Sequence, residues 1–202
     1  MTDAGPPDPS GPLRKPRKIF LLVGTVVAVA LGIGLFTSIG SGPNAGGAHE
    51  GNAVPAFTRQ NIGPVGAPQV SVPADGGAAA TPTVLLFFGN WCTACHQELP
   101  PLAAAVRAQD KAGGALSRIR VVGVDDLDSS SSAQAFIKAT GVTFPVAYDP
   151  DASLTSGTFY FDGDPFAVFV NGDGTIARIV RGDVLTPSSF TADERALIPS
   201  GT

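Results

Sequence analysis

The stretch from Thr83 to Pro100 constrains the fold of this chain more than any other part of the sequence. It opens with an apolar run, Val84 to Phe88, that contains β-branched and aromatic residues and is followed by Gly-Asn. A short run of this kind predicts a strand that is buried on both faces of a sheet. A turn and the start of a helix come next, and the only two cysteines of the chain, Cys92 and Cys95, lie at that junction.

The position of these cysteines predicts redox chemistry. Amides at a helix N-terminus have no intrahelical acceptor, so this end of the helix carries a partial positive charge. A thiolate is stabilised there, and the thiolate is the attacking form of cysteine. A mixed disulfide formed at one sulfur can then be resolved by the other. We predict that Cys92, at the exposed turn, is the nucleophile and that Cys95, which is more shielded, is the resolving thiol.

A Cys-x-x-Cys pair also occurs in zinc sites and structural disulfides. A four-cysteine zinc site needs a second pair, which the sequence lacks, and only His49 and His96 could add nitrogen ligands. A strand that leads directly into Trp-Cys-x-x-Cys and then a helix favours a redox pair. We therefore expect neither a metal nor an organic cofactor.

The N-terminal part predicts a membrane anchor. Residues 19–39 carry no charge and have the length of a membrane-spanning helix. Basic residues end the Pro/Gly-rich segment 1–18, which we expect to be a disordered cytoplasmic tail. A cleaved signal peptide is the alternative, although its apolar region is usually shorter and ends at a small-x-small site. Residues 40–53 predict a flexible linker, and everything beyond the anchor is expected outside the cell membrane.

Beyond residue 54 the pattern predicts one α/β domain that reaches residue 198. The expected strands are 54–58, 69–72, 83–88, 120–124, 166–170 and 175–180, and the expected helices are 93–111, 132–140 and 186–197. Pro100 and Pro101 predict a kink in the first helix. This order indicates a mixed sheet with helices on both faces. The net charge of −4 provides no basic surface, so nucleic acid is not an expected partner.

Several separated motifs resemble the thioredoxin superfamily, and within it the membrane-anchored TlpA/ResA-like thiol–disulfide oxidoreductases. The resemblance covers about residues 54–185. Its motifs are Leu85–Cys95 with Glu98 and Pro100, Val121–Asp125, Phe144–Pro145 with Asp149–Asp151, and Asp164–Pro165 with Phe169–Gly174. It implies a thioredoxin-like fold. Two positions depart from the family pattern, since Ala94 stands where proline is usual and Phe166-Ala167 where Thr-Thr is frequent.

The resemblance also implies roles for four residues around the cysteines. Trp91 is expected to cover the disulfide and help dock substrates; the alternative is a core aromatic. Glu98 is expected to exchange a proton with Cys95, or else only to complement the helix dipole. Pro165 is expected to be cis, and Asp164 would offer backbone groups to an extended substrate chain. The charge of Asp164 would disfavour a thiolate.

Four other residues are expected to have no part in the chemistry. His96 reads as a solvated helix residue rather than a group that tunes a cysteine pKa. Pro145 reads as structural, and Asp125-Asp126 as a solvated strand end.

The sequence therefore predicts an anchored extracytoplasmic enzyme that exchanges a dithiol/disulfide with protein thiols and depends on a membrane electron-relay partner. It would serve either as a reductant in cytochrome c maturation or in oxidative folding. One alternative is a peroxiredoxin-like peroxidase, although the Pro-x-x-x-Thr-x-x-Cys pattern of that class is absent before Cys92. Another is a non-catalytic thioredoxin-fold module for binding or metal delivery.

Overall fold

The computed structural model describes residues 1, 47–73, 81–182 and 185–199. The chain divides into two units, Met1–Gly42 and Pro43–Thr202, and all described residues except Met1 belong to the second. The predicted tail, the predicted anchor at 19–39 and most of the predicted linker lie outside the described residues. Within the part that is described, no helix combines the length and the apolar character needed to cross a membrane.

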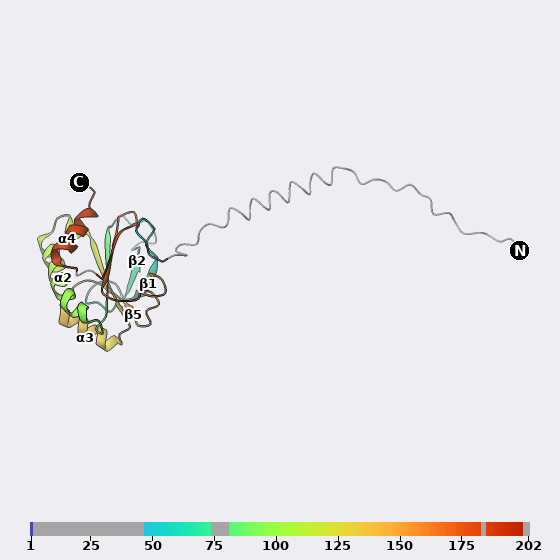
Figure 1. Ribbon diagram of the computed structural model, residues 1–202, viewed down its shortest axis with the longest axis horizontal. Helices are drawn as coiled ribbons and strands as arrows, with labels where there is room; N and C mark the ends of the chain where they lie inside the picture. The colour runs from blue at the N-terminus through green and yellow to red at the C-terminus, as the bar shows by residue number, and fades with distance from the viewer. Residues whose placement is uncertain (2–46, 74–80, 183–184, 200–202) are drawn as a thin grey trace. The chain divides into compact units, whose positions relative to one another are not determined.

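The second unit is organised around a five-stranded mixed sheet (Figure 1). The strands lie in the order β5 (Val146–Asp149), β4 (Arg120–Asp126), β3 (Thr83–Phe88), β6 (Phe166–Val170) and β7 (Ile176–Arg181). β3, β4 and β5 are parallel to one another, whereas β6 pairs antiparallel with both β3 and β7. All of β3 is buried, as its apolar run predicts. The cysteines therefore lie just beyond the C-terminal end of β3, the central strand of the sheet.

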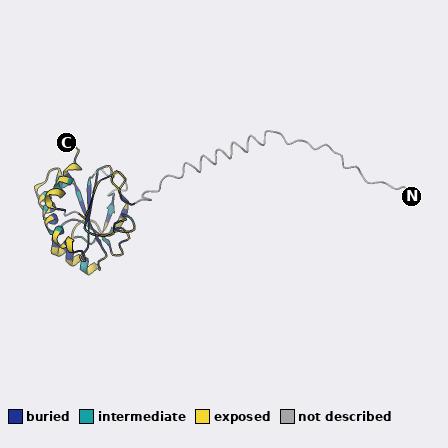
Figure 2. Cartoon of the chain, viewed as in Figure 1, coloured by how far each residue is buried: buried dark blue, intermediate teal, exposed yellow. Residues whose placement is uncertain are grey.

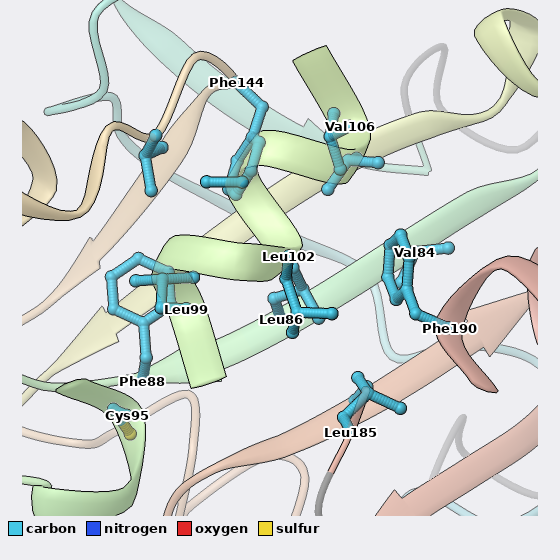
Figure 3. Packing of buried hydrophobic residues seen from close by; sticks show 14 of the residues in the cluster. Val84, Leu86, Phe88, Cys95, Leu99, Leu102, Val106, Phe144, Leu185 and Phe190 are labelled. Carbon is cyan, nitrogen blue, oxygen red and sulfur yellow. The ribbon is translucent and has the colours of Figure 1, made fainter. Parts of the chain in front are cut away.

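The side chains of β3 alternate between two apolar clusters. Leu86 and Phe88 face a cluster formed with the helices α2 (Thr93–Ala112), α3 (Ser130–Thr140) and α4 (Pro187–Ala196) (Figure 3). Leu85 and Phe87 face the other cluster, which contains residues of the antiparallel hairpin β1 (Phe57–Gln60) and β2 (Gln69–Val72). Figure 2 shows the buried sheet between these layers and the exposed outer surfaces of the helices.

The prediction of helices on both faces is wrong for the described residues. The buried apolar residues of α2, α3 and α4 that belong to a core cluster all pack on one face, and none of them belongs to the cluster on the other face. That second face is covered by the β1–β2 hairpin and by residues 154–161. The chain after β5 is rich in Ser, Thr and Gly, which favour turns over helix, and it forms successive turns.

The helix ends agree with the sequence signals. Gly113 follows α2 with φ of +70°, and Gly141 ends α3 in the left-handed conformation. α4 begins with a capping box between Thr186 and Ser189. Pro100 and Pro101 lie within the continuous helix α2. A short 3-10 helix, η1 (Leu116–Arg118), connects α2 to β4.

The folded domain includes residues before the expected start at residue 54. Residues 47–53 were predicted to end a flexible linker, yet they hydrogen-bond to the β6–β7 hairpin. Gly51 N donates to Ile176 O at 2.8 Å, and Ile176 N donates to Asn52 O at 2.8 Å. Ala48 is fully buried in the second cluster. These residues therefore belong to the folded domain.

Candidate redox site

Cys92 and Cys95 form a disulfide at the N-terminus of α2. Cys92 is the N-cap residue, and its Sγ accepts a hydrogen bond from Cys95 N at 3.1 Å. This is the amide environment that stabilises a thiolate. The expectation that Cys92 is exposed is wrong, because it is 4% exposed, compared with 1% for Cys95. Cys92 is nevertheless the more accessible sulfur, whereas Cys95 packs in the apolar cluster with Phe88 and Leu99 (Figure 3).

Trp91 lies on the surface beside this disulfide. It is 47% exposed, so the alternative of a core aromatic is wrong. Its Nε1 donates to the carbonyl oxygen of Asp126 at 3.0 Å, which fixes the indole against the end of β4. A Cβ at Gly89 would overlap Nε1, so only glycine lets the indole lie this close to the backbone.

Leu127 adds a second exposed apolar side chain that sequence reasoning missed. It directly follows Asp126, is 57% exposed and has φ of +54°. This left-handed conformation is costly for a residue with a branched side chain. Its amide donates to Asp149 O at 3.2 Å, which helps hold the turn. Because no local sequence signal marks a leucine for this conformation, only the structure reveals it.

Pro165 follows a cis peptide bond, as the family resemblance implies. It lines a small pocket together with Cys95 and Glu98, and apolar residues of β3, α2, β6 and β7 form much of the remaining wall. The pocket measures about 20 Å³, which is room for one water molecule. The structure thus brings Pro165, which is distant in sequence, next to Cys95 and Glu98, which lie one turn apart on α2.

Glu98 is half-buried on α2, one turn after Cys95. Its Oε2 accepts a hydrogen bond from Leu185 N at 3.2 Å. Burial raises the pKa of Glu98 above its ordinary value, and the Leu185 amide offsets this only in part. The direction of this shift is the one expected for a carboxyl group that resists ionisation. Its proposed proton exchange with Cys95 stays a prediction.

The prediction that Asp125 and Asp126 form a solvated strand end is wrong. They are 0% and 3% exposed, respectively, where the end of β4 pairs with β5 and accepts a hydrogen bond from Trp91. Burial, followed by the charges of Asp128 and Asp126, raises the pKa of Asp125 to about 8. Burial is also the largest cause that raises the pKa of Asp126.

Asp164 is a further carboxyl group near the site whose pKa is raised. Burial, followed by the charge of Asp126, raises the pKa of Asp164 to about 9. This shift opposes the expected negative charge of Asp164 at the site. The low dielectric around the carboxyl group disfavours its charged form more strongly than the sequence indicated.

Asn90 and His96 connect the cysteine loop to its neighbours. Asn90 N donates to Asp128 Oδ2 at 2.5 Å, and Asp128 Oδ1 accepts from Ser132 Oγ at the start of α3. His96 is exposed, as expected; its Nε2 lies 2.8 Å from Asn90 O and its ring lies 4.6 Å from that of Phe136. These contacts hold Asn90, and with it the loop before Cys92, against its neighbours.

Comparisons with known proteins agree with this geometry. The family model described as AhpC/TSA family matches residues 51–178. Thiol-disulfide oxidoreductase ResA of Bacillus subtilis (strain 168) is 24% identical over 193 residues, which cover 94% of this chain and 98% of ResA.

Two solved structures show the same fold. A secreted Mycobacterium tuberculosis disulfide oxidoreductase homologous to E. coli DsbE is 20% identical with a TM-score of 0.57, covering 70% of this chain and 96% of that one. StoA from Bacillus subtilis is 23% identical with a TM-score of 0.54, covering 70% and 98%. Together with the family match over more than half of its length, this likeness shows that the chain belongs to the AhpC/TSA family of thioredoxin-fold proteins.

Proposed function

We propose that this chain is a membrane-anchored, extracytoplasmic thiol–disulfide oxidoreductase that acts on protein thiols. The observation that carries the proposal is the Cys92–Cys95 disulfide at the N-terminus of α2, with cis-Pro165 lining a pocket beside it. The name of the ResA relative supports the same activity. Reduction of apocytochrome c thiols and oxidative folding of secreted proteins are both compatible with this chemistry.

On the enzyme, the exchange with a substrate disulfide involves only the sulfurs of Cys92 and Cys95 and the proton of Cys95. In the reduced enzyme, the Cys92 thiolate attacks a substrate disulfide, one substrate sulfur leaves as a thiolate, and a mixed disulfide forms. Cys95 then loses its proton and attacks Cys92 Sγ, which releases the second substrate thiolate and restores the Cys92–Cys95 disulfide. The substrate gains two electrons and the enzyme loses two. A membrane electron-relay partner must reset the pair after each turnover.

The two alternatives from the sequence have weaker support. A peroxidase of the peroxiredoxin type would carry a Pro-x-x-x-Thr-x-x-Cys pattern before its cysteine, which is absent before Cys92, and Cys92 is here bonded to a cysteine three residues away. A metal-delivery module would need further ligands close to the cysteines. Among the described residues, no group of three or more His, Cys, Asp or Glu side chains could hold a metal ion.

The location proposed for the domain can be tested directly. A reporter enzyme that works only outside the cytoplasm, fused after Thr202, is expected to be active, because the basic cluster before residues 19–39 should retain the N-terminus inside. Activity of a cytoplasm-specific reporter at the same position would contradict the topology. A mature protein that begins after about Ala48 would contradict the anchor alone.

Leu127 is expected to contribute to docking of protein substrates. Leu127→Gly removes an exposed apolar side chain one residue after Asp126, whose carbonyl holds the Trp91 indole, and relieves a left-handed backbone. The protein should therefore become slightly more stable, while its KM for a protein disulfide rises about 5-fold. Tyr160→Gly is the matched control, since Tyr160 is also exposed, with φ of +59°, but lies on a different turn. Equal effects of the two changes on KM would exclude a docking role for Leu127.

A further inference from the structure

Asp126 and Asp164 bring two carboxyl groups together next to the redox site. Asp126 is the last residue of β4 and Asp164 directly precedes cis-Pro165. As carboxylates, both side chains could only accept hydrogen bonds, and in that state neither oxygen of Asp164 nor Oδ1 of Asp126 has a donor within the described residues. A single proton changes this, because a carboxylic acid can donate. Asp126 and Asp164 each shift the pKa of the other through a side-chain hydrogen bond, and the charge of Asp126 also raises the pKa of Asp164.

The surroundings favour retention of that proton. Asp128 adds negative charge from beyond the end of β4 and Asp149 adds more from β5, whereas Asp125 adds charge only above its own raised pKa of about 8. Arg59 lies 3.8 Å from Asp149, and the Arg181 guanidinium stacks 3.9 Å from the centre of the Phe161 ring, so both cations have other contacts. Burial of two adjacent carboxylates that both carry a charge is costly, and one shared proton removes half of that charge.

The pair also connects the two walls of the site. The backbone carbonyl of Asp126 accepts the hydrogen bond from Trp91 Nε1, so Asp126 belongs to the wall that carries the indole. Asp164 belongs to the loop that carries Pro165, which lines the pocket beside Cys95. A hydrogen bond between the two side chains would therefore fix the separation of the two surfaces that we propose as the docking site.

We propose that Asp126 and Asp164 share one proton, and that this hydrogen bond positions the Pro165 loop relative to Trp91 for docking of protein substrates. Both are positioning residues, since they act through Trp91 and Pro165. The docking part of this inference rests on the proposed oxidoreductase function. The shared proton does not, and it can be measured separately.

Substitutions at Asp164 in the full-length chain separate hydrogen bonding from titration. Asp164→Ala removes the donor and is expected to raise the KM for reduction of insulin disulfides roughly 10-fold, the effect of losing one hydrogen bond to a charged group. Asp164→Asn retains an N–H donor toward the Asp126 carboxylate and should behave like the wild type at pH 7. The rate with oxidised glutathione should change less than about 2-fold, because a small disulfide uses little of the docking surface. Asp162→Asn, an exposed position in the same loop, is the charge-matched control.

The pH profile provides a readout that a merely structural role would not change. In the wild type, the KM for insulin should rise above pH about 9, as the shared proton leaves and two carboxylates repel each other. Asp164→Asn cannot lose this proton, so its KM should not show that rise. Ionisation of the cysteines affects all variants alike and cancels when each KM is divided by that of Asp162→Asn.

Carbon-13 NMR of labelled aspartate carboxyl groups measures the proton without any substrate. The wild type should show a carboxyl carbon that titrates near pH 9 and is lost in Asp164→Asn, in addition to that of Asp125, which titrates near pH 8 and is retained in the variant. Absence of the Asp164 signal in the wild type would overturn the inference, as would an Asp164→Asn variant as impaired as Asp164→Ala. If Asp164→Ala does not fold, the NMR titration and the pH profile of Asp164→Asn still test whether the two carboxyl groups share a proton. A wild type that shows the signal but does not reduce insulin would contradict the proposed function and leave the shared proton in place.

Discussion

Replacing Cys92 with serine is expected to abolish exchange with protein disulfides, because a serine hydroxyl at neutral pH does not attack a disulfide sulfur. Replacing Cys95 with serine should allow the first attack and block the second, so that enzyme and substrate accumulate as a stable mixed disulfide. The difference follows from position. Cys92 caps α2 and receives the Cys95 amide, whereas Cys95 lies within the apolar cluster.

Gel electrophoresis without reductant, after reaction of each reduced variant with insulin, measures this difference. A covalent complex that is reversed by dithiothreitol should form with Cys95→Ser and not with Cys92→Ser. The double variant is the control for adventitious trapping. Equal trapping by Cys92→Ser would show that the nucleophile is Cys95 and that our assignment is wrong.

Replacing Glu98 with glutamine is expected to slow the resolving step by roughly 10–100-fold, at the low end of general acid/base effects. Glutamine retains the size and the acceptor for Leu185 N but cannot take the proton from Cys95. Attack by Cys92 should change little, because Cys92 lies at the helix end rather than in the pocket with Glu98.

The pH dependence of this step follows from the raised pKa of Glu98. Below that pKa the carboxyl group is protonated and cannot act as a base toward Cys95, so the resolving rate of the wild type should increase as pH rises through it. The increase should be absent in Glu98→Gln. Stopped-flow measurement of Trp91 fluorescence in both redox directions reports the step, with Asp110→Asn as an exposed control on the same helix.

A purely structural Glu98 would behave differently. If the carboxylate only complements the helix dipole, its loss should cost about 0.3–1 kcal/mol of stability and leave the exchange rates unchanged. Lowered thermal stability with an unchanged resolving rate would therefore exclude Glu98 from the chemistry.

The parts of the fold that could be predicted from the sequence are those coded by contiguous patterns. The apolar run of β3 and the cysteines at the start of α2 are local signals, and the hairpin between β6 and β7 has a turn sequence of its own. β5 was missed because it has only four residues between Pro145 and Pro150. It becomes a strand through its pairing with β4, which a local pattern does not reveal.

The electrostatics of the site could not be predicted for the same reason. Asp125 and Asp126 end β4 after its apolar residues, and in the sequence this looks like a strand whose end is exposed to solvent. Their burial depends on segments that are distant in sequence, such as the Trp91 loop. Asp126 and Asp164 interact although they lie 38 positions apart in the sequence. A sequence pattern gives the residue types of such a pair but not their proximity.

The central claim is that the Cys92–Cys95 pair exchanges two electrons with protein thiols. The most direct measurement mixes the oxidised full-length chain with a reduced protein that forms one disulfide, quenches with acid, alkylates the free thiols and weighs both proteins by mass spectrometry. We predict that the enzyme gains two alkylated cysteines for every partner molecule that loses two, and that the same equilibrium is reached from the opposite starting state. A Cys92–Cys95 pair that stays oxidised while the partner stays reduced, with no mixed disulfide at any time, would contradict the account.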